Sequence, residues 1–174
     1  LSWVSPAGAS ITRGAQPMTG LMFARSVHDE EYLEQIRLAN DAAKPLHILD
    51  CRPFVNSVAN CAVQGGWESA SYYTGCRVAF LDIANIHSVR DSFLKMRSTF
   101  GSCRFPGAQP SAVLLGVAKS AWYDHISSVL QGVAQVVRRV GGAHESVFVH
   151  CSDAWDRTSQ LCALAQLCLD PYYR

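Results

Sequence analysis

Three short apolar runs stand out in the pattern of hydrophobic and polar positions along the chain. They cover Leu46–Cys51, Arg77–Ile83 and Ser146–His150, and each gives way to polar or turn-forming residues. Apolar runs of this length, without helical spacing, are typical of strands that are buried on both faces. The pattern therefore predicts three buried strands.

Between and after these strands, apolar residues recur at the spacing of one face of a helix. The first helix begins with acidic residues, which favours a helix N-terminus, and the longest has a valine-rich stripe from 126 to 140 that we expect in the core. The predicted helices are His28–Asn40, about Ile86–Thr99, about Ser120–Val140 ending at Gly141 and Gly142, and one from near Arg157 to just before Pro171.

The remaining segments carry Gly, Pro and Ser at close spacing, which indicates loops. Residues 1–27 are predicted to be loop with one edge strand at Leu21–Ala24, and residues 101–118 to be a surface connection. Strands that alternate with helices predict an α/β fold with a largely parallel sheet flanked by helices. In such sheets ligands bind beyond the carboxyl ends of the strands.

Composition narrows the class of protein. With 174 residues and 49% hydrophobic content, one domain spanning 1–174 is expected. A formal net charge of +1 gives no footprint for nucleic acid or an acidic membrane surface. The pattern has neither a membrane-spanning run nor a leader, so we expect a soluble, non-secreted chain. A start at Leu1 and a stop at Arg174 suggest a fragment of a longer protein.

Cysteine usage gives a further constraint. The seven cysteines are odd in number and contain no Cys-x-x-Cys pair, which argues against a disulfide framework or a zinc site and favours a reducing compartment. Six of them are expected to be structural: Cys51, Cys61, Cys76, Cys103, Cys162 and Cys168.

Cys151 differs because Arg157 follows it six positions later, in the predicted loop between the third strand and the last helix. A phosphoryl group could rest on the loop N–H groups and the positive end of that helix, while arginine binds two phosphate oxygens. The same dipoles would favour a thiolate nucleophile. Asp153 and Asp156 lie inside the loop and could supply the acid and base. The alternatives are a buried thiol and two helix-capping carboxylates.

The string His150-Cys-Ser-Asp-Ala-Trp-Asp-Arg-Thr158 resembles the signature of the myotubularin phosphoinositide 3-phosphatases, which have glycine where this chain has Ala154. The resemblance extends over nearly the whole chain. Other segments that are similar to the family, in order, are Ile11 to Arg13, Gln16 and Pro17, Asp50 to Pro53, Asn56 to Asn60, Gly65 to Glu68, Asn85 to His87, Arg90 to Ser92, Trp122 to Ile126 and Leu169 to Arg174.

This resemblance implies roles for individual residues, with no metal or cofactor. Cys151 would be the nucleophile, Arg157 the phosphate clamp and Asp156 the general acid, with Asp153 a substrate contact or second acid-base group. Substrate-binding residues would be Ser152, Ala154, Trp155, Asn60, Asn85 and Ile86.

The resemblance also implies a cysteine-phosphatase, tyrosine-phosphatase-like fold, of which this chain would be the central part. The substrate would be the 3-phosphate of phosphatidylinositol 3-phosphate or 3,5-bisphosphate, hydrolysed through a phosphocysteine. The protein would be cytoplasmic and peripheral on endosomal membranes, contacting them through regions outside this chain. Homodimers or heterodimers with other myotubularins are further expected partners.

Two alternative functions stay open. Ala154 could strain the loop if that position requires a positive φ, which would suit a weak or inactive adaptor that binds phosphoinositide or a partner phosphatase. A protein phosphotyrosine or dual-specificity phosphatase is the second alternative, although tyrosine phosphatases place their acid on a separate loop.

Overall fold

A five-stranded sheet forms the centre of the computed structural model, which describes residues 1–20, 25–63, 65–102 and 109–174. The strand order is β1-β2-β5-β3-β4, and only β1 runs antiparallel to its neighbour. The strands are β1 Trp3–Val4, β2 Ser10–Gly14, β3 Leu46–Asp50, β4 Cys76–Phe80 and β5 Val147–His150. The predicted mixed α/β fold with a largely parallel sheet is confirmed.

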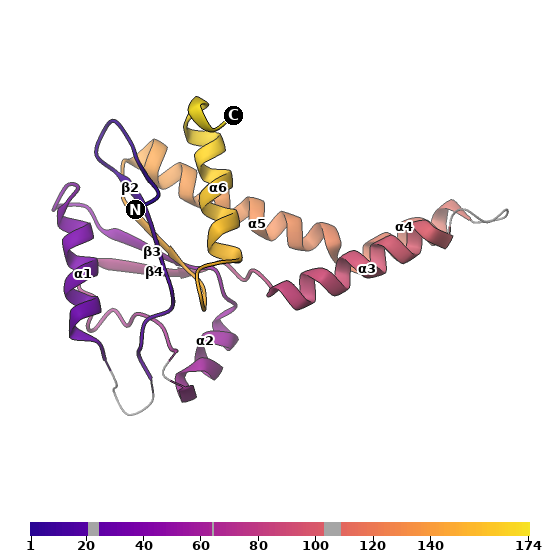
Figure 1. The fold of residues 1–174 in the computed structure, drawn as a ribbon, viewed down its shortest axis with the longest axis horizontal. Coiled ribbons are helices and arrows are strands. Elements are labelled where there is room, and N and C mark those ends of the chain that lie inside the picture. Colours follow the sequence, from indigo (N-terminus) through magenta and orange to yellow (C-terminus); the bar gives the residue numbers. More distant parts are fainter. Residues whose placement is uncertain (21–24, 64, 103–108) are drawn as a thin grey trace.

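Helices cover both faces of this sheet (Figure 1). On one face, Leu33 from α1 packs with Ile48 and Phe148, whereas on the other face Val136 from α5 and Leu161 from α6 pack with strand residues of the opposite parity. The helices are α1 Val27–Leu38, α2 Phe54–Asn60, α3 Ile86–Ser102, α4 Pro110–Ser120, α5 Trp122–Val137 and α6 Arg157–Leu169, with short helical turns at Cys61–Val63, Arg138–Ala143 and Pro171–Tyr173.

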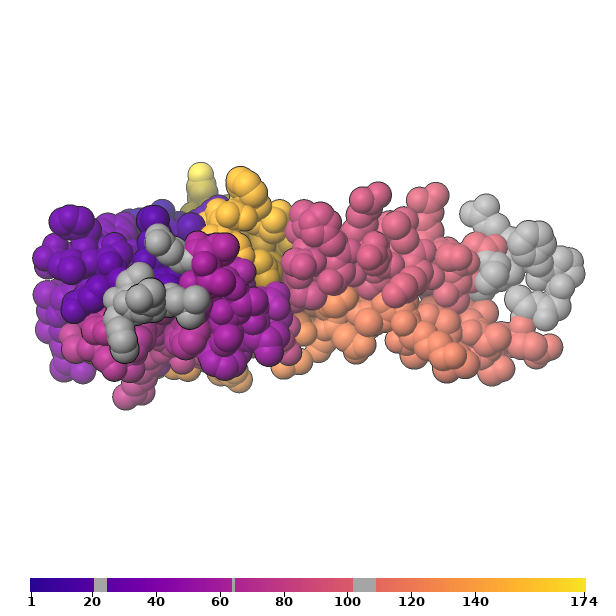
Figure 2. All heavy atoms as spheres, turned by 90° about the horizontal axis from the view of Figure 1, so that it is seen from below, coloured from indigo at the N-terminus to yellow at the C-terminus, as the bar shows by residue number. Residues whose placement is uncertain are grey.

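An arm of three helices extends away from the sheet. Figure 2 shows α3 running alongside a second row formed by α4 and the start of α5, which follow one another end to end, and this gives the described part of the molecule an elongated outline. The rings of Phe93 in α3 and Trp122 in α5 lie 5.3 Å apart between centroids and join the two layers of the arm. Within the described residues, no helix is long and apolar enough to cross a membrane.

Two of the predicted loops are wrong. Residues 1–27 contain β1 and β2, and Ile11 of β2 aligns with Val147 of β5 in the buried part of the sheet. The local pattern is weak because β2 mixes polar residues with glycine, so its extended conformation depends on pairing with β5. The predicted edge strand at Leu21–Ala24 lies outside the described residues.

The predicted surface connection at 101–118 is also wrong, because α4 occupies Pro110–Ser120. Proline was taken as a loop signal, whereas Pro110 stands in the first turn of this helix, where its missing N–H has no intrahelical partner to lose. Ala121 then adopts a left-handed conformation with φ of 60° and separates α4 from α5, so the long helix begins at Trp122 instead of Ser120.

The valine-rich stripe is only partly core. Val133, Val136 and Val140 are buried over the sheet, but Ile126 and Leu130 are 37% and 53% exposed. The first half of α5 belongs to the arm and has no strand beneath it, so its apolar face lies open (Figure 1).

Candidate functional site

The segment from Cys151 to Asp156 forms a loop between β5 and α6, and α6 begins at Arg157 as predicted. β5 is flanked by β2 and β3, and all three end at the same edge of the sheet. The carboxyl ends of parallel strands meet there, which is where α/β folds bind ligands. The fold therefore places this loop at the position expected for a functional site.

Cys151 lies at the base of the loop and is 2% exposed. Burial raises the pKa of its thiol, but the side chain and backbone N–H of Thr158, the N–H of Ala154 and the charge of Arg157 outweigh burial. The net effect lowers the pKa of Cys151, and the Ala154 N–H donates to its Sγ at 3.2 Å. A thiolate in this setting is a stronger nucleophile than an ordinary buried thiol.

The other cysteines near the sheet behave in the opposite way. Burial raises the pKa of Cys51 far above its usual range and also raises that of Cys162 and that of Cys76, the last to about 11. Among the cysteines with a clearly shifted pKa, Cys151 is therefore the one shifted toward the thiolate.

The loop backbone carries several N–H groups that are not used in hydrogen bonds. Among the described residues, no group accepts a hydrogen bond from the backbone N–H of Ser152, Asp153, Trp155 or Asp156. Unused N–H groups at a helix N-terminus are the usual ligands of a phosphate group in proteins. The loop can therefore hold an anion against Cys151 without rearranging other hydrogen bonds.

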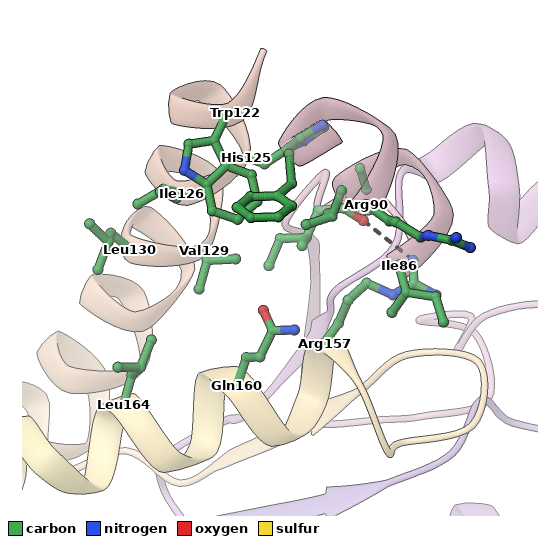
Figure 3. Close-up of a pocket in the computed structure, with 14 residues that line it drawn as sticks. Ile86, Arg90, Trp122, His125, Ile126, Val129, Leu130, Arg157, Gln160 and Leu164 are labelled. Carbon is green, nitrogen blue, oxygen red and sulfur yellow. Dashed lines mark hydrogen bonds between the residues drawn. The ribbon is translucent and has the colours of Figure 1, made fainter. Parts of the chain in front are cut away.

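Arg157 is 9% exposed, and its guanidinium has no carboxylate partner among the residues that the structure describes. Its two Nη atoms donate to the carbonyl of Ile83 at 3.3 Å and to the Ser152 hydroxyl at 3.4 Å, both of which are neutral. Figure 3 shows the side chain pointing from the start of α6 toward Ile86. Because a buried cation without a counterion is costly, this position suits an anionic ligand.

Asp153 is exposed and Asp156 half-buried, on the same loop as Cys151. Asp156 occupies the N-cap position of α6, yet its side chain makes no capping hydrogen bond. In the described part of the chain, neither carboxylate has a hydrogen-bond or ion-pair partner. Both groups are therefore free to exchange protons with a ligand in the loop.

The remaining loop residues differ in exposure. Ser152 is half-buried, with its hydroxyl against Arg157, whereas the Trp155 side chain is 69% exposed. The Trp155 indole could therefore contact a ligand from the outer side of the loop.

Asn60, Asn85 and Ile86 come from the segments that follow β3 and β4. Asn60 ends α2 and donates to the Gln16 side chain at 3.1 Å, while Asn85 accepts from the N–H of Ser88 and caps α3. Ile86 is 46% exposed and lies across a cavity from Arg157 (Figure 3). Of these three residues, Ile86 lines the cavity that Arg157 also lines, whereas Asn60 and Asn85 do not line it.

That cavity has a volume of about 530 Å³ and an apolar lining. Gln160 and Leu164 of α6 form one side and residues of α3 and α5 the other, with Arg157 at the end nearest the loop (Figure 3). Sequence patterning missed it because its walls belong to three helices that are separate in the sequence.

Two further residues hold the loop in place, and neither was given a role from the sequence. Arg13 at the end of β2 donates to the carbonyl of Ala154 at 2.8 Å and to the Ser159 hydroxyl at 3.0 Å. The Gln16 N–H donates to the carbonyl of Ser152 at 3.0 Å. Both residues lie in N-terminal segments that resemble the myotubularin family. This resemblance was the sequence signal that could have pointed to them.

Ala154 has a φ of 67°, in the left-handed region that favours glycine. The sequence predicts strain in the loop if position 154 has a positive φ, and it does. Alanine therefore stands where its Cβ costs conformational energy. The strained residue also points its N–H at the Cys151 sulfur and its carbonyl at Arg13. The left-handed conformation is thus part of how the loop is built.

Replacing Ala154 by Gly should raise the free energy of unfolding by about 1 kcal/mol, because glycine adopts positive φ without a Cβ penalty. The measurement is denaturant unfolding followed by circular dichroism. Ala121→Gly is a matched control, since Ala121 has a φ of 60° outside the loop and should give a similar gain. Stabilisation by the control but not by Ala154→Gly would show that the loop conformation is not strained.

Comparisons with known proteins agree with this geometry. Residues 1–174 match the family model described as a myotubularin-like phosphatase domain. The chain is 44% identical over 175 aligned residues to myotubularin of Xenopus tropicalis and 43% identical to bovine phosphatidylinositol-3,5-bisphosphate 3-phosphatase MTMR2. Rat myotubularin is 42% identical.

Each alignment covers 100% of this chain but only 27% or 28% of the relative, so the chain spans little more than a quarter of the length of these relatives. Since the family model covers every residue, the chain belongs to the myotubularin-related family of phosphatases.

Proposed function

We propose that the protein is a phosphoinositide 3-phosphatase that removes the 3-phosphate through a phosphocysteine intermediate. The observation that carries the proposal is the pairing of a thiol of lowered pKa, Cys151, with a buried arginine, Arg157, that has no counterion among the described residues. The names of the bovine, orangutan and mouse relatives, phosphatidylinositol-3,5-bisphosphate 3-phosphatase, support the substrate class.

In the first step the Cys151 thiolate attacks phosphorus, an S–P bond forms, and the bond from phosphorus to the inositol oxygen breaks. Loop N–H groups and Arg157 hold the phosphoryl oxygens and stabilise the charge that they carry in the transition state. Asp156 gives its proton to the departing inositol oxygen.

In the second step water attacks the phosphocysteine. The S–P bond breaks, the thiolate is restored, inorganic phosphate leaves, and the Asp156 carboxylate takes a proton from the attacking water. Asp153 is placed to contact the substrate or to assist this proton transfer. Proton transfer and substrate contact both require carboxylates without other partners. Among the described residues, neither Asp153 nor Asp156 has a hydrogen-bond or ion-pair partner for its side chain.

Asn60, Asn85 and Ile86, which follow β3 and β4 in the chain, would contact the rest of the headgroup. Ser152, Ala154 and Trp155 would contribute loop contacts. A lipid substrate is reached at a membrane surface, so we further propose a cytoplasmic protein that binds peripherally to endosomal membranes and forms homodimers or heterodimers with other myotubularins.

Phosphate release by the full-length protein tests the proposal. We expect vanadate-sensitive release from phosphatidylinositol 3-phosphate and 3,5-bisphosphate in vesicles, and much slower release from phosphotyrosine peptides. Faster turnover of the peptides would favour the protein-phosphatase alternative instead.

A second candidate is a weak or inactive adaptor, which the strained Ala154 favours. Retention of Cys151, Asp156 and Arg157 in a loop with free N–H groups argues for catalysis. Absence of turnover by the wild type, together with vesicle binding unaffected by changes in the loop, would favour the adaptor.

A further inference from the structure

Four charged side chains are buried together directly behind the loop. They are Asp50 at the end of β3, Arg52 just after it, Glu68 in the connection to β4, and His150 at the end of β5. Each is 0–2% exposed. Burying charges is costly even when they are paired, so a cluster of this kind calls for a purpose beyond stability.

Asp50 and Arg52 satisfy each other. The Arg52 guanidinium donates to both Asp50 carboxylate oxygens, at 2.7 to 3.1 Å, and its other donors reach the carbonyls of Gly65 and Gly66 and the side chain of Gln16. The charge of Asp50 is therefore matched. Among the described residues, Glu68 has no cationic partner other than His150, and its Oε2 lies 3.2 Å from His150 Nε2.

Both ring nitrogens of His150 face acceptors. Nε2 faces Glu68 Oε2 at 3.2 Å and Asp50 Oδ2 at 3.8 Å, while Nδ1 lies 3.2 Å from the carbonyl oxygen of Cys151. Nε2 and the Glu68 Oε2 are close enough for an ion pair but are not aligned for a hydrogen bond, and neither atom has a hydrogen-bond partner among the described residues. A carboxylate buried at this distance is stabilised by a positive charge on the ring, so the distances and the burial favour a charged His150.

The charges around His150 also favour the protonated ring. Burial lowers the pKa of His150, but the charges of Glu68 and Asp50 and the Cys151 carbonyl outweigh burial and raise it to about 9. The other titratable groups nearby are Asp29 and Tyr73, which are hydrogen-bonded to each other at 2.7 Å, and Asp29 also interacts with Glu68 and His150. The cation is therefore expected to persist at neutral pH.

We propose that Glu68 is a positioning residue for the reaction at Cys151. Its carboxylate keeps His150 charged, so that Nδ1–H holds the carbonyl of Cys151 and a cation adjoins the residue that carries the nucleophile. The effect on catalysis rests on the proposed function, whereas the charge state of His150 does not.

Glu68→Gln in the full-length protein tests this without any substrate. With the carboxylate removed, Asp50 and Arg52 still neutralise each other, so His150 should lose its extra proton near pH 7. The His150 cation lies closer to Cys151 than Glu68 does, because His150 adjoins it in sequence and contacts its carbonyl. Losing both charges should therefore disfavour the thiolate.

Two measurements read this out. Nitrogen-15 NMR of the histidine rings should show His150 doubly protonated at pH 7.5 in the wild type and neutral at the same pH in Glu68→Gln. The midpoint of the pH dependence of Cys151 alkylation by iodoacetamide should rise by about one unit, which makes alkylation about tenfold slower below both midpoints.

Glu145→Gln is the matched control. Glu145 also pairs with a histidine of the sheet, His47, with 2.8 Å between Oε2 and Nε2, but at the opposite end of β3 from Cys151. It should leave the alkylation profile unchanged. Glu68→Asp, which keeps a carboxylate, should recover most of the wild-type profile and serves as the second variant if Glu68→Gln does not fold.

A His150 that is neutral in the wild type would overturn the proposal, as would an alkylation midpoint in Glu68→Gln equal to that of the wild type. If both readouts respond as expected but the wild type releases no phosphate from lipid, the proposed function fails and the positioning role of Glu68 stands. In an active enzyme, the Glu68→Gln rate should fall most at low pH and recover as pH rises, whereas general damage would lower it at every pH.

Discussion

Replacing Cys151 by Ser should lower phosphate release from phosphatidylinositol 3-phosphate by on the order of 10⁵-fold, as expected when the nucleophile of a covalent mechanism is removed. A serine hydroxyl fits the space of the thiol but stays protonated in these surroundings, since the loop dipoles that favour a thiolate act on a far less acidic group. The measurement is the initial rate of phosphate release by the full-length variant on lipid vesicles.

Binding should survive this change. The loop N–H groups and Arg157 are untouched, so the variant should hold phosphoinositide vesicles at least as well as the wild type and act as a substrate trap. Cys168→Ser is the matched control, because Cys168 is an exposed cysteine of α6. Retention of more than a few per cent of the activity by Cys151→Ser, with the control fully active, would exclude the phosphocysteine mechanism.

Arg157→Lys should lower kcat by about 10³-fold although the positive charge is kept. A lysine offers a point charge instead of a planar fork, so it cannot bind two phosphoryl oxygens while also donating to Ile83 and Ser152. Loss of one aligned donor in the transition state typically reduces kcat by about 10² to 10³-fold. Steady-state kinetics on lipid vesicles measures the loss of kcat, and the inhibition constant of vanadate measures how well the loop still binds the phosphoryl-like anion.

A surface arginine provides the comparison. Arg138→Lys changes an exposed residue in the turn after α5, and should leave kcat and vanadate inhibition unchanged. If Arg157→Lys changed only the Michaelis constant, Arg157 would contribute to binding and not to the transition state.

Local patterns predicted the elements that are strongly apolar. The runs at β3 and β5 and the start of α6 were found because each is marked in its own local sequence, by a short apolar run for the strands and by helical spacing for the helix. β2 and α4 were missed for opposite reasons. The polar residues and glycine of β2 become a strand only beside β5, and Pro110 opens a helix where proline was taken as a loop signal.

For the site, the sequence by itself determined which functional groups the loop contains. Cys151, Arg157, the two aspartates and the family signature lie close together in the chain, so their spacing could be read directly. The tertiary structure decided whether those groups are available. It leaves Arg157 buried without a counterion and gives Ala154 its positive φ. It also brings Glu68 to His150 across the sheet. Ion pairing and burial depend on residues far apart in the chain, so no local pattern could supply them.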